Sequence, residues 1–122
     1  MILADTSIWI EHLRGRMPEM QRQLDQGKVF MHPFVVAELA LGSLRDRANT
    51  LAELDGLLRV EVAELREVRS MVEGHSLYAK GIGLIDAHLI ASCLITPGTE
   101  LWTRDTALGN VAGALGVRAA LP

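Results

Sequence analysis

Short apolar runs alternate along this chain with longer segments whose apolar residues recur at helical spacing. Short runs bounded by turn residues are typical of buried strands. We expect strands over residues 1–4, 28–32, 59–65, 100–104 and 117–119. The longer segments, which have Gly or Pro near their ends, predict helices. These helices cover residues 5–15, 18–27, 33–44, 47–59, 64–81, 84–95 and 105–116.

The order of these elements predicts the fold class. Strands that are separated by helices pair in parallel, because a parallel pair needs a long crossover connection. The sequence therefore predicts an α/β fold, a three-layer sandwich in which helices cover a central, mostly parallel sheet. Ligands of such sheets bind beyond the carboxyl ends of the strands. Residues that directly follow the strands are therefore the first candidates for a functional site.

Length and composition are typical of one compact domain. The chain has 122 residues, of which 49% are hydrophobic, and we expect a single domain over residues 1–122. The formal net charge of −3 argues against a broadly basic nucleic-acid-binding surface. The single cysteine, Cys93, fits a core position in a reducing, cytoplasmic protein. No segment approaches the roughly 20 apolar residues of a membrane span, so we expect no contact with a membrane.

Two acidic residues directly follow predicted strands. Asp5 comes after the apolar run at the start of the chain, and Asp105 follows the strand that contains Trp102. Both can cap the next helix, since an Asp side chain accepts hydrogen bonds from the first backbone N–H groups. A carboxylate at the end of a buried strand is costly without a partner. That partner is either the helix backbone or a cation shared with other acids.

Two further acids interrupt apolar helices. Glu38 has Val35 and Leu41 among its neighbours at helical spacing, so a solvated charged face explains it poorly. Asp86 stands in the first turn of the helix over residues 84–95. Stabilisation by the helix dipole, about 0.3–1 kcal/mol, does not offset the burial of a charge. Each acid has a structural explanation when taken singly, but together the four suggest one acidic site.

Four carboxylates that converge repel one another and require a cation. Oxygen-only ligands favour Mg²⁺ or Mn²⁺ over zinc, which prefers His and Cys, and the four histidines show no metal-ligand spacing. Carboxylate-bound Mg²⁺ on an α/β sheet usually serves phosphate chemistry. Three nearby hydroxyls are suited either to orient a carboxylate or a water, or to cap helices. They belong to Thr6, Ser7 and Thr103.

The arrangement of these residues resembles that of a known family. DTSIWIEHLRG near the start, the helical AEL, DAHLIA after a glycine-rich turn, and LWTRD before the last helix occur in this order. Together they resemble the PIN-domain ribonucleases, specifically the VapC-like toxins of bacterial toxin–antitoxin pairs. The resemblance spans nearly the whole chain, and no position of the family's acidic quartet is missing. Leu108 stands where many members have an aromatic residue, a departure that concerns packing more than chemistry.

This resemblance implies an endoribonuclease in which Mg²⁺ or Mn²⁺ activates a water for attack on an RNA phosphodiester. The family's catalytic, metal-binding acids match Asp5, Glu38, Asp86 and Asp105. Its supporting hydroxyls match Thr6 or Ser7, and Thr103. The resemblance also implies a homodimer that a cognate VapB-like antitoxin inhibits. We expect a segment of that antitoxin to bind a groove at the first helix pair, residues 7–27.

Basic residues complete the predicted site, whereas the two tryptophans are expected elsewhere. Arg14, Lys80 and Arg104 are the basic residues that we expect to bind RNA around the cleft, together with Arg16, although each is also explained as a surface charge. The two tryptophans lie in apolar runs. We therefore expect them in the core or at a dimer contact rather than as base-stacking platforms.

Three other functions are compatible with parts of the pattern. A catalytically silent PIN-like module would act only by binding a partner or RNA. A phosphoryl-transfer enzyme would use Asp5 as its nucleophile, but such phosphatases need a second acid two residues later, where this chain has Ser7. A metal-free ribonuclease would use histidines as acid and base and would stay active in EDTA. The complete acidic quartet favours the metal-dependent nuclease.

Overall fold

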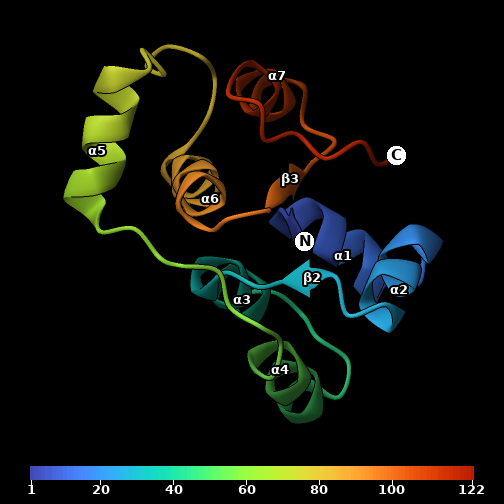
Figure 1. Cartoon of the computed structure of the whole chain (residues 1–122). Helices are drawn as coiled ribbons and strands as arrows, with labels where there is room; N and C mark the ends of the chain where they lie inside the picture. The colour runs from blue at the N-terminus through green and yellow to red at the C-terminus, as the bar shows by residue number, and fades with distance from the viewer.

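The computed structural model of the protein describes all residues 1–122. Its three short parallel strands have the order β2–β1–β3. They are β1 (Ile2–Ala4), β2 (Val29–Phe30) and β3 (Glu100–Trp102). The helices are α1 (Thr6–Leu13), α2 (Pro18–Asp25), α3 (Pro33–Ala40), α4 (Arg47–Asp55), α5 (Leu65–Gly74), α6 (Leu84–Ile95) and α7 (Thr106–Ala114). In Figure 1, α3 and α6 lie to one side of the strands and α1 and α2 to the other, and the predicted α/β fold is confirmed.

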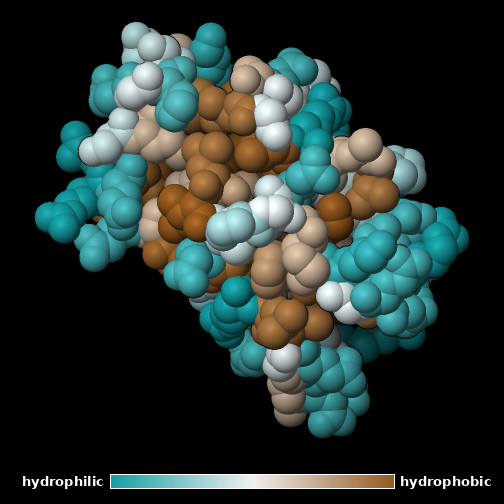
Figure 2. Space-filling view, viewed as in Figure 1, coloured by the Kyte–Doolittle hydropathy of each residue, from teal (hydrophilic) through white to brown (hydrophobic).

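Apolar residues of the strands and of the surrounding helices form the core. Its main cluster has 24 buried residues. Trp9 and Trp102 are 2% and 0% exposed, so the prediction that they belong to the core is confirmed. Cys93 is also buried, as expected. Viewed from the same side as in Figure 1, apolar side chains reach the surface in the area between α5 and α7 (Figure 2).

Two of the predicted strands do not form regular strands, so these predictions are wrong. The segment over residues 59–65 contributes a single bridge, between Met31 and Arg59, and the segment over residues 117–119 a single bridge, between Leu101 and Arg118. Each lies at an outer edge of a sheet whose strands have only two or three residues. Such an edge offers few backbone groups for pairing, so alternating apolar residues alone did not produce a ladder.

The helix predicted over residues 64–81 is also too long. The structure ends α5 at Gly74 with a Schellman motif, in which Ser76 has a left-handed φ of 53°. The Leu77 N–H donates to the Val72 carbonyl at 2.9 Å. Leu77 is 6% exposed, so its burial holds this helix end in place. No helix of the protein combines the length and the apolar character that crossing a bilayer requires.

Candidate active site

Asp5 and Asp105 lie at the same edge of the sheet. Ala4 of β1 pairs with Trp102 of β3 in parallel, so the chain leaves both strands at neighbouring positions. Asp5 Oδ1 accepts from the Ile8 N–H at 3.1 Å and caps α1. Asp105 Oδ1 accepts from the Leu108 N–H at 2.8 Å and caps α7 in the same way. The predicted capping role of both acids is therefore confirmed.

The Thr103 hydroxyl connects these two acids. It donates to Asp5 Oδ2 and accepts from the Asp105 N–H at 3.0 Å. The Ser7 hydroxyl donates to Asp5 Oδ1 at 2.8 Å. Asp5 is only 6% exposed, and its carboxylate accepts hydrogen bonds from two hydroxyls and one backbone N–H. These bonds satisfy a carboxylate whose burial would otherwise be costly.

Glu38 approaches the same edge from α3. Its Oε1 accepts from the Thr6 hydroxyl at 2.5 Å, which ties α3 to the first residue of α1. Glu38 is half-buried, so the expectation that it is not part of a fully solvated face holds. The predicted hydroxyls therefore all serve carboxylates of the predicted quartet: Thr6 bonds to Glu38, and Ser7 and Thr103 bond to Asp5.

Asp86 reveals how the four acids are related in space. It lies in the first turn of α6, and its Oδ2 accepts from the Gly83 N–H at 3.1 Å. Burial raises the pKa of Asp86, and this outweighs the Gly83 bond, which lowers it. The negative charges of Asp105, Asp5 and Glu38 each raise that pKa further. Four acids from different parts of the sequence therefore face one region of the molecule.

The four acidic side chains face one region of the molecule without being in close contact with one another. No three His, Cys, Asp or Glu side chains stand close enough together to hold a metal ion as a group. Glu38, Asp86 and Asp105 each use only one carboxylate oxygen in hydrogen bonds within the chain, which leaves the other oxygen free. Mutual repulsion of like charges explains why these groups stay apart. An all-oxygen donor set of this kind suits Mg²⁺ or Mn²⁺.

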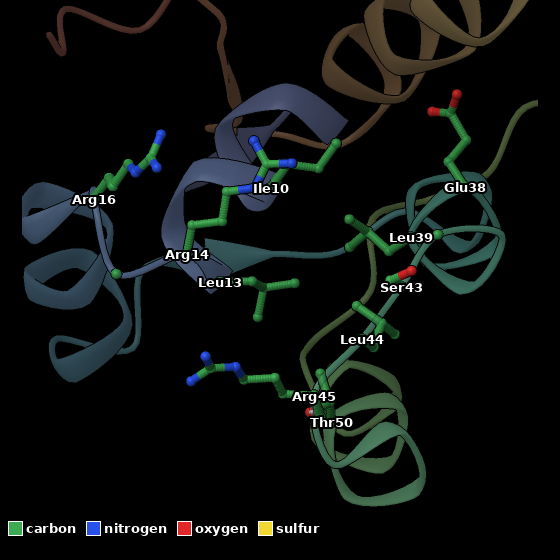
Figure 3. Close-up of a pocket in the computed structure, with 12 residues that line it drawn as sticks. Ile10, Leu13, Arg14, Arg16, Glu38, Leu39, Ser43, Leu44, Arg45 and Thr50 are labelled. Atoms are coloured by element: carbon green, nitrogen blue, oxygen red, sulfur yellow. Dashed lines mark hydrogen bonds between the residues drawn. The ribbon is translucent and has the colours of Figure 1, made fainter.

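A groove of about 730 Å³ extends from Glu38 along the space between α1 and the turn from α3 to α4. Figure 3 shows the side chains of Arg14 and Arg45 reaching over this space, with Glu38 at its far end. Arg16 also lines the groove. Arg45 was missed from the sequence, because only the packing of α3 and α4 brings it opposite α1.

The other predicted basic residues have different surroundings. Lys80 is exposed in the segment between α5 and α6 and forms no salt bridge. The Arg104 Nε donates to the Pro122 carbonyl oxygen at 2.9 Å, so its guanidinium is held by the end of the chain. The end of α1 and the residues after it line the groove, whereas α2 does not. Binding of an antitoxin segment at the first helix pair, residues 7–27, stays a prediction.

Two histidines at the helices that carry Glu38 and Asp86 were not singled out from the sequence. His32 caps α3 by accepting the Phe34 N–H at its Nδ1, 3.0 Å away. Its ring centre lies 6.2 Å from that of His88 on α6. Burial lowers the pKa of His32 to about 4, with smaller contributions from the charges of His88 and Arg59. The two rings lie between α3 and α6, the helices that carry Glu38 and Asp86.

The fold and this acidic site define the class of the protein. The family model of the PIN domain matches residues 2–114, and the chain belongs to that family. Among curated proteins, it is 39% identical over 117 residues to Ribonuclease VapC32 from two strains of Mycobacterium tuberculosis, covering 96% of this chain and 94% of the relative. Among solved structures, it matches the crystal structure of FitAcB from Neisseria gonorrhoeae with a TM-score of 0.59 at 27% identity, covering 93% of this chain and 94% of that one. The resemblance to VapC-like PIN ribonucleases is confirmed.

Proposed function

We propose that this protein is a divalent-metal-dependent endoribonuclease that acts as the toxin of a toxin–antitoxin pair. One observation carries the proposal: hydrogen bonds through Thr6 and Thr103 hold Glu38, Asp5 and Asp105 at one edge of the sheet, and the charges of all three raise the pKa of Asp86. A chain gains nothing in stability from such a cluster of like charges. Function at a cation-dependent site explains the cluster, and the ribonuclease relatives support RNA as the substrate.

The acids of the site would bind the metal ion, and the hydroxyls would orient the acids. The free oxygens of Glu38, Asp86 and Asp105 would bind the ion, and Asp5 would complete the negative site. When bound, such an ion polarises the phosphodiester, lowers the pKa of a water and stabilises the leaving oxygen. Ser7 and Thr103 fix the orientation of the Asp5 carboxylate, and Thr6 fixes that of Glu38, so few side chains must be ordered when RNA binds.

Cleavage of cellular RNA by the purified protein tests this proposal. Activity should require Mg²⁺ or Mn²⁺ and stop in EDTA. Changes outside a metal's direct ligands typically cost 10–100-fold, so we expect Asp86→Asn to lower the rate by about 100-fold or more. Asp25→Asn, the same substitution at an exposed position of α2, is the matched control. Activity in EDTA would support a histidine mechanism, and no cleavage with any divalent ion would support a catalytically silent module.

The groove beside Glu38 is the site that we propose for the antitoxin. It combines apolar side chains, among them Ile10 and Leu13, with the basic rim described above. A segment seated there would cover Glu38 and exclude RNA from the acids, which would explain inhibition physically. Leu13→Asp should weaken binding of the antitoxin encoded beside this gene, and Leu65→Asp, outside the groove, should not.

We also propose that the protein forms a homodimer. Leu58, Val62 and Ile95 are 63%, 45% and 44% exposed. A hydrogen bond of 3.0 Å from the Glu61 N–H to the Thr96 hydroxyl joins the two segments that carry them. Exposed apolar side chains on adjoining segments favour an interface over contact with water. Sedimentation should show a dimer that Val62→Asp converts to a monomer.

A further inference from the structure

The segment over residues 75–83, between α5 and α6, forms part of the rim of the acidic site. At its end, the Gly83 N–H donates to Asp86 Oδ2. Further back, a Cβ built on Gly81 would lie 3.4 Å from the Cβ of Ala107, in the first turn of the helix that Asp105 caps. The segment therefore contacts the N-terminal turns of both helices that contribute acids on this side.

The backbone of this segment has an unusual, well-defined shape. Ala79 and Gly81 have φ angles of 57° and 78°, in addition to the left-handed Ser76. This conformation is unfavourable for Ala, and unfavourable backbone conformations often occur at functional sites. Burial of Leu77 anchors the segment on one side. The result is a turn that leaves Tyr78, the only tyrosine of the chain, 59% exposed in the segment that leads to Asp86.

Tyr78 lines a second groove, of about 220 Å³, between α5 and the start of α6. The groove is mainly apolar, and its apolar residues include Val68, Val72, Leu77, Ile82 and Leu84. Two charged side chains, Arg69 and Glu73, also line it. Gly83 belongs to the same groove and donates to Asp86, so the groove reaches the start of the helix that carries one of the four acids.

Two positive charges lie in this groove or next to it. Arg69 lines it, Lys80 follows Tyr78 by two residues in the same segment, and neither forms a salt bridge. Glu73 is the one acid of the lining, so Arg69, Lys80 and Glu73 together leave a net positive charge beside an aromatic side chain. This combination matches the chemistry of single-stranded nucleic acid, whose bases stack and whose phosphates are negative. The charge pattern therefore favours an RNA strand over an apolar peptide as the occupant.

We infer that this groove binds a nucleobase of the RNA strand beside the cleaved phosphodiester, with the base stacked on Tyr78 and an adjoining phosphate bound by Lys80. The inference rests on the proposed nuclease function and adds a determinant of substrate choice to it. Arg69 and Glu73 can donate to and accept from base edges. Tyr78 and these two residues would therefore select among RNA sequences, a property that the four acids cannot supply.

Binding of a fluorescein-labelled, mixed-sequence RNA of about 12 nucleotides, in EDTA to prevent cleavage, tests the inference. Tyr78→Ala should weaken binding by about 5- to 100-fold, the range that base–aromatic stacking contributes. Tyr78→Phe should bind as the wild type does, because the ring is retained. Leu65→Ala removes an apolar side chain with similar exposure, 55%, from outside the groove and is the control. Lys80→Gln should lower the slope of log K against log salt by about 0.7.

Equal RNA affinity of Tyr78→Ala and the wild type would overturn the inference while leaving a demonstrated nuclease activity untouched. A change in sedimentation without a change in RNA affinity would assign the groove to self-association and would also overturn it. Failure of the wild type to cleave RNA with any divalent ion would instead overturn the nuclease function, while the binding series still decides the groove. If Tyr78→Ala fails to fold, Tyr78→Leu keeps apolar packing, removes the ring and should show the same loss of affinity.

Discussion

Thr103→Val removes one hydroxyl from the centre of the site and leaves the shape of the side chain nearly unchanged. Thr103 is 7% exposed, donates to the Asp5 carboxylate and accepts from the Asp105 N–H at 3.0 Å. The substitution therefore leaves a buried carboxylate and a backbone N–H each without one partner. It tests whether the hydroxyl connects the two acids in solution.

The expected loss of stability follows from these two bonds. A hydrogen bond to a charged group contributes about 1.5–3 kcal/mol, and one between neutral groups about 0.5–1.5 kcal/mol. Asp5 keeps its bonds from Ser7 and Ile8, whereas the part-buried Asp105 N–H loses its only partner. We therefore expect Thr103→Val to lower the free energy of unfolding by about 2–3 kcal/mol, or the Tm by roughly 10 °C.

Urea unfolding, followed by the fluorescence of the two buried tryptophans, measures this loss. Thr103→Ser keeps the hydroxyl and should retain most of the stability. Thr106→Val changes the same side chain at an exposed position of α7 and should stay within about 0.5 kcal/mol of the wild type. An unfolding midpoint of Thr103→Val equal to that of the wild type would refute the proposed connection between Asp5 and Asp105.

Three further outcomes are expected. Because burial lowers the pKa of His32 to about 4, the unfolded chain binds a proton there at higher pH than the folded chain does. The free energy of unfolding should therefore fall by up to about 3 kcal/mol as pH drops from about 6.5 to 4, and urea titrations of His32→Gln should show a smaller fall. In EDTA, the Tm of Asp86→Asn should be a few degrees above that of the wild type, because the substitution removes a negative charge that three other acids repel. Millimolar Mn²⁺ should raise the Tm of the wild type but not that of Asp86→Asn. An unchanged Tm of the wild type in Mn²⁺ would count against the metal site. Gly113→Ala, at an exposed helical position where the new Cβ lies 3.9 Å from Arg118 Cδ, should raise the free energy of unfolding by about 0.5 kcal/mol in the same urea assay.

Local chemistry determined much of this protein from the sequence alone. The helix predicted over residues 84–95 has the same bounds in the structure. Asp5 and Asp105 cap the helices that they precede, because capping depends only on a side chain and the next three residues. The acids of the quartet could be singled out because each is a charge in an apolar stretch, which is visible without any contact being known.

Only the tertiary structure decided which groups meet. Thr103 and Asp5 are 98 residues apart in sequence, and their hydrogen bond exists because β1 and β3 are neighbours. Packing likewise decided that residues 59–65 form one bridge instead of a strand, that Arg45 lies across a groove from α1, and that His32 faces His88. Hydrophobic pattern and capping act over a few residues, whereas the direction of a side chain into a shared site depends on how distant elements pack.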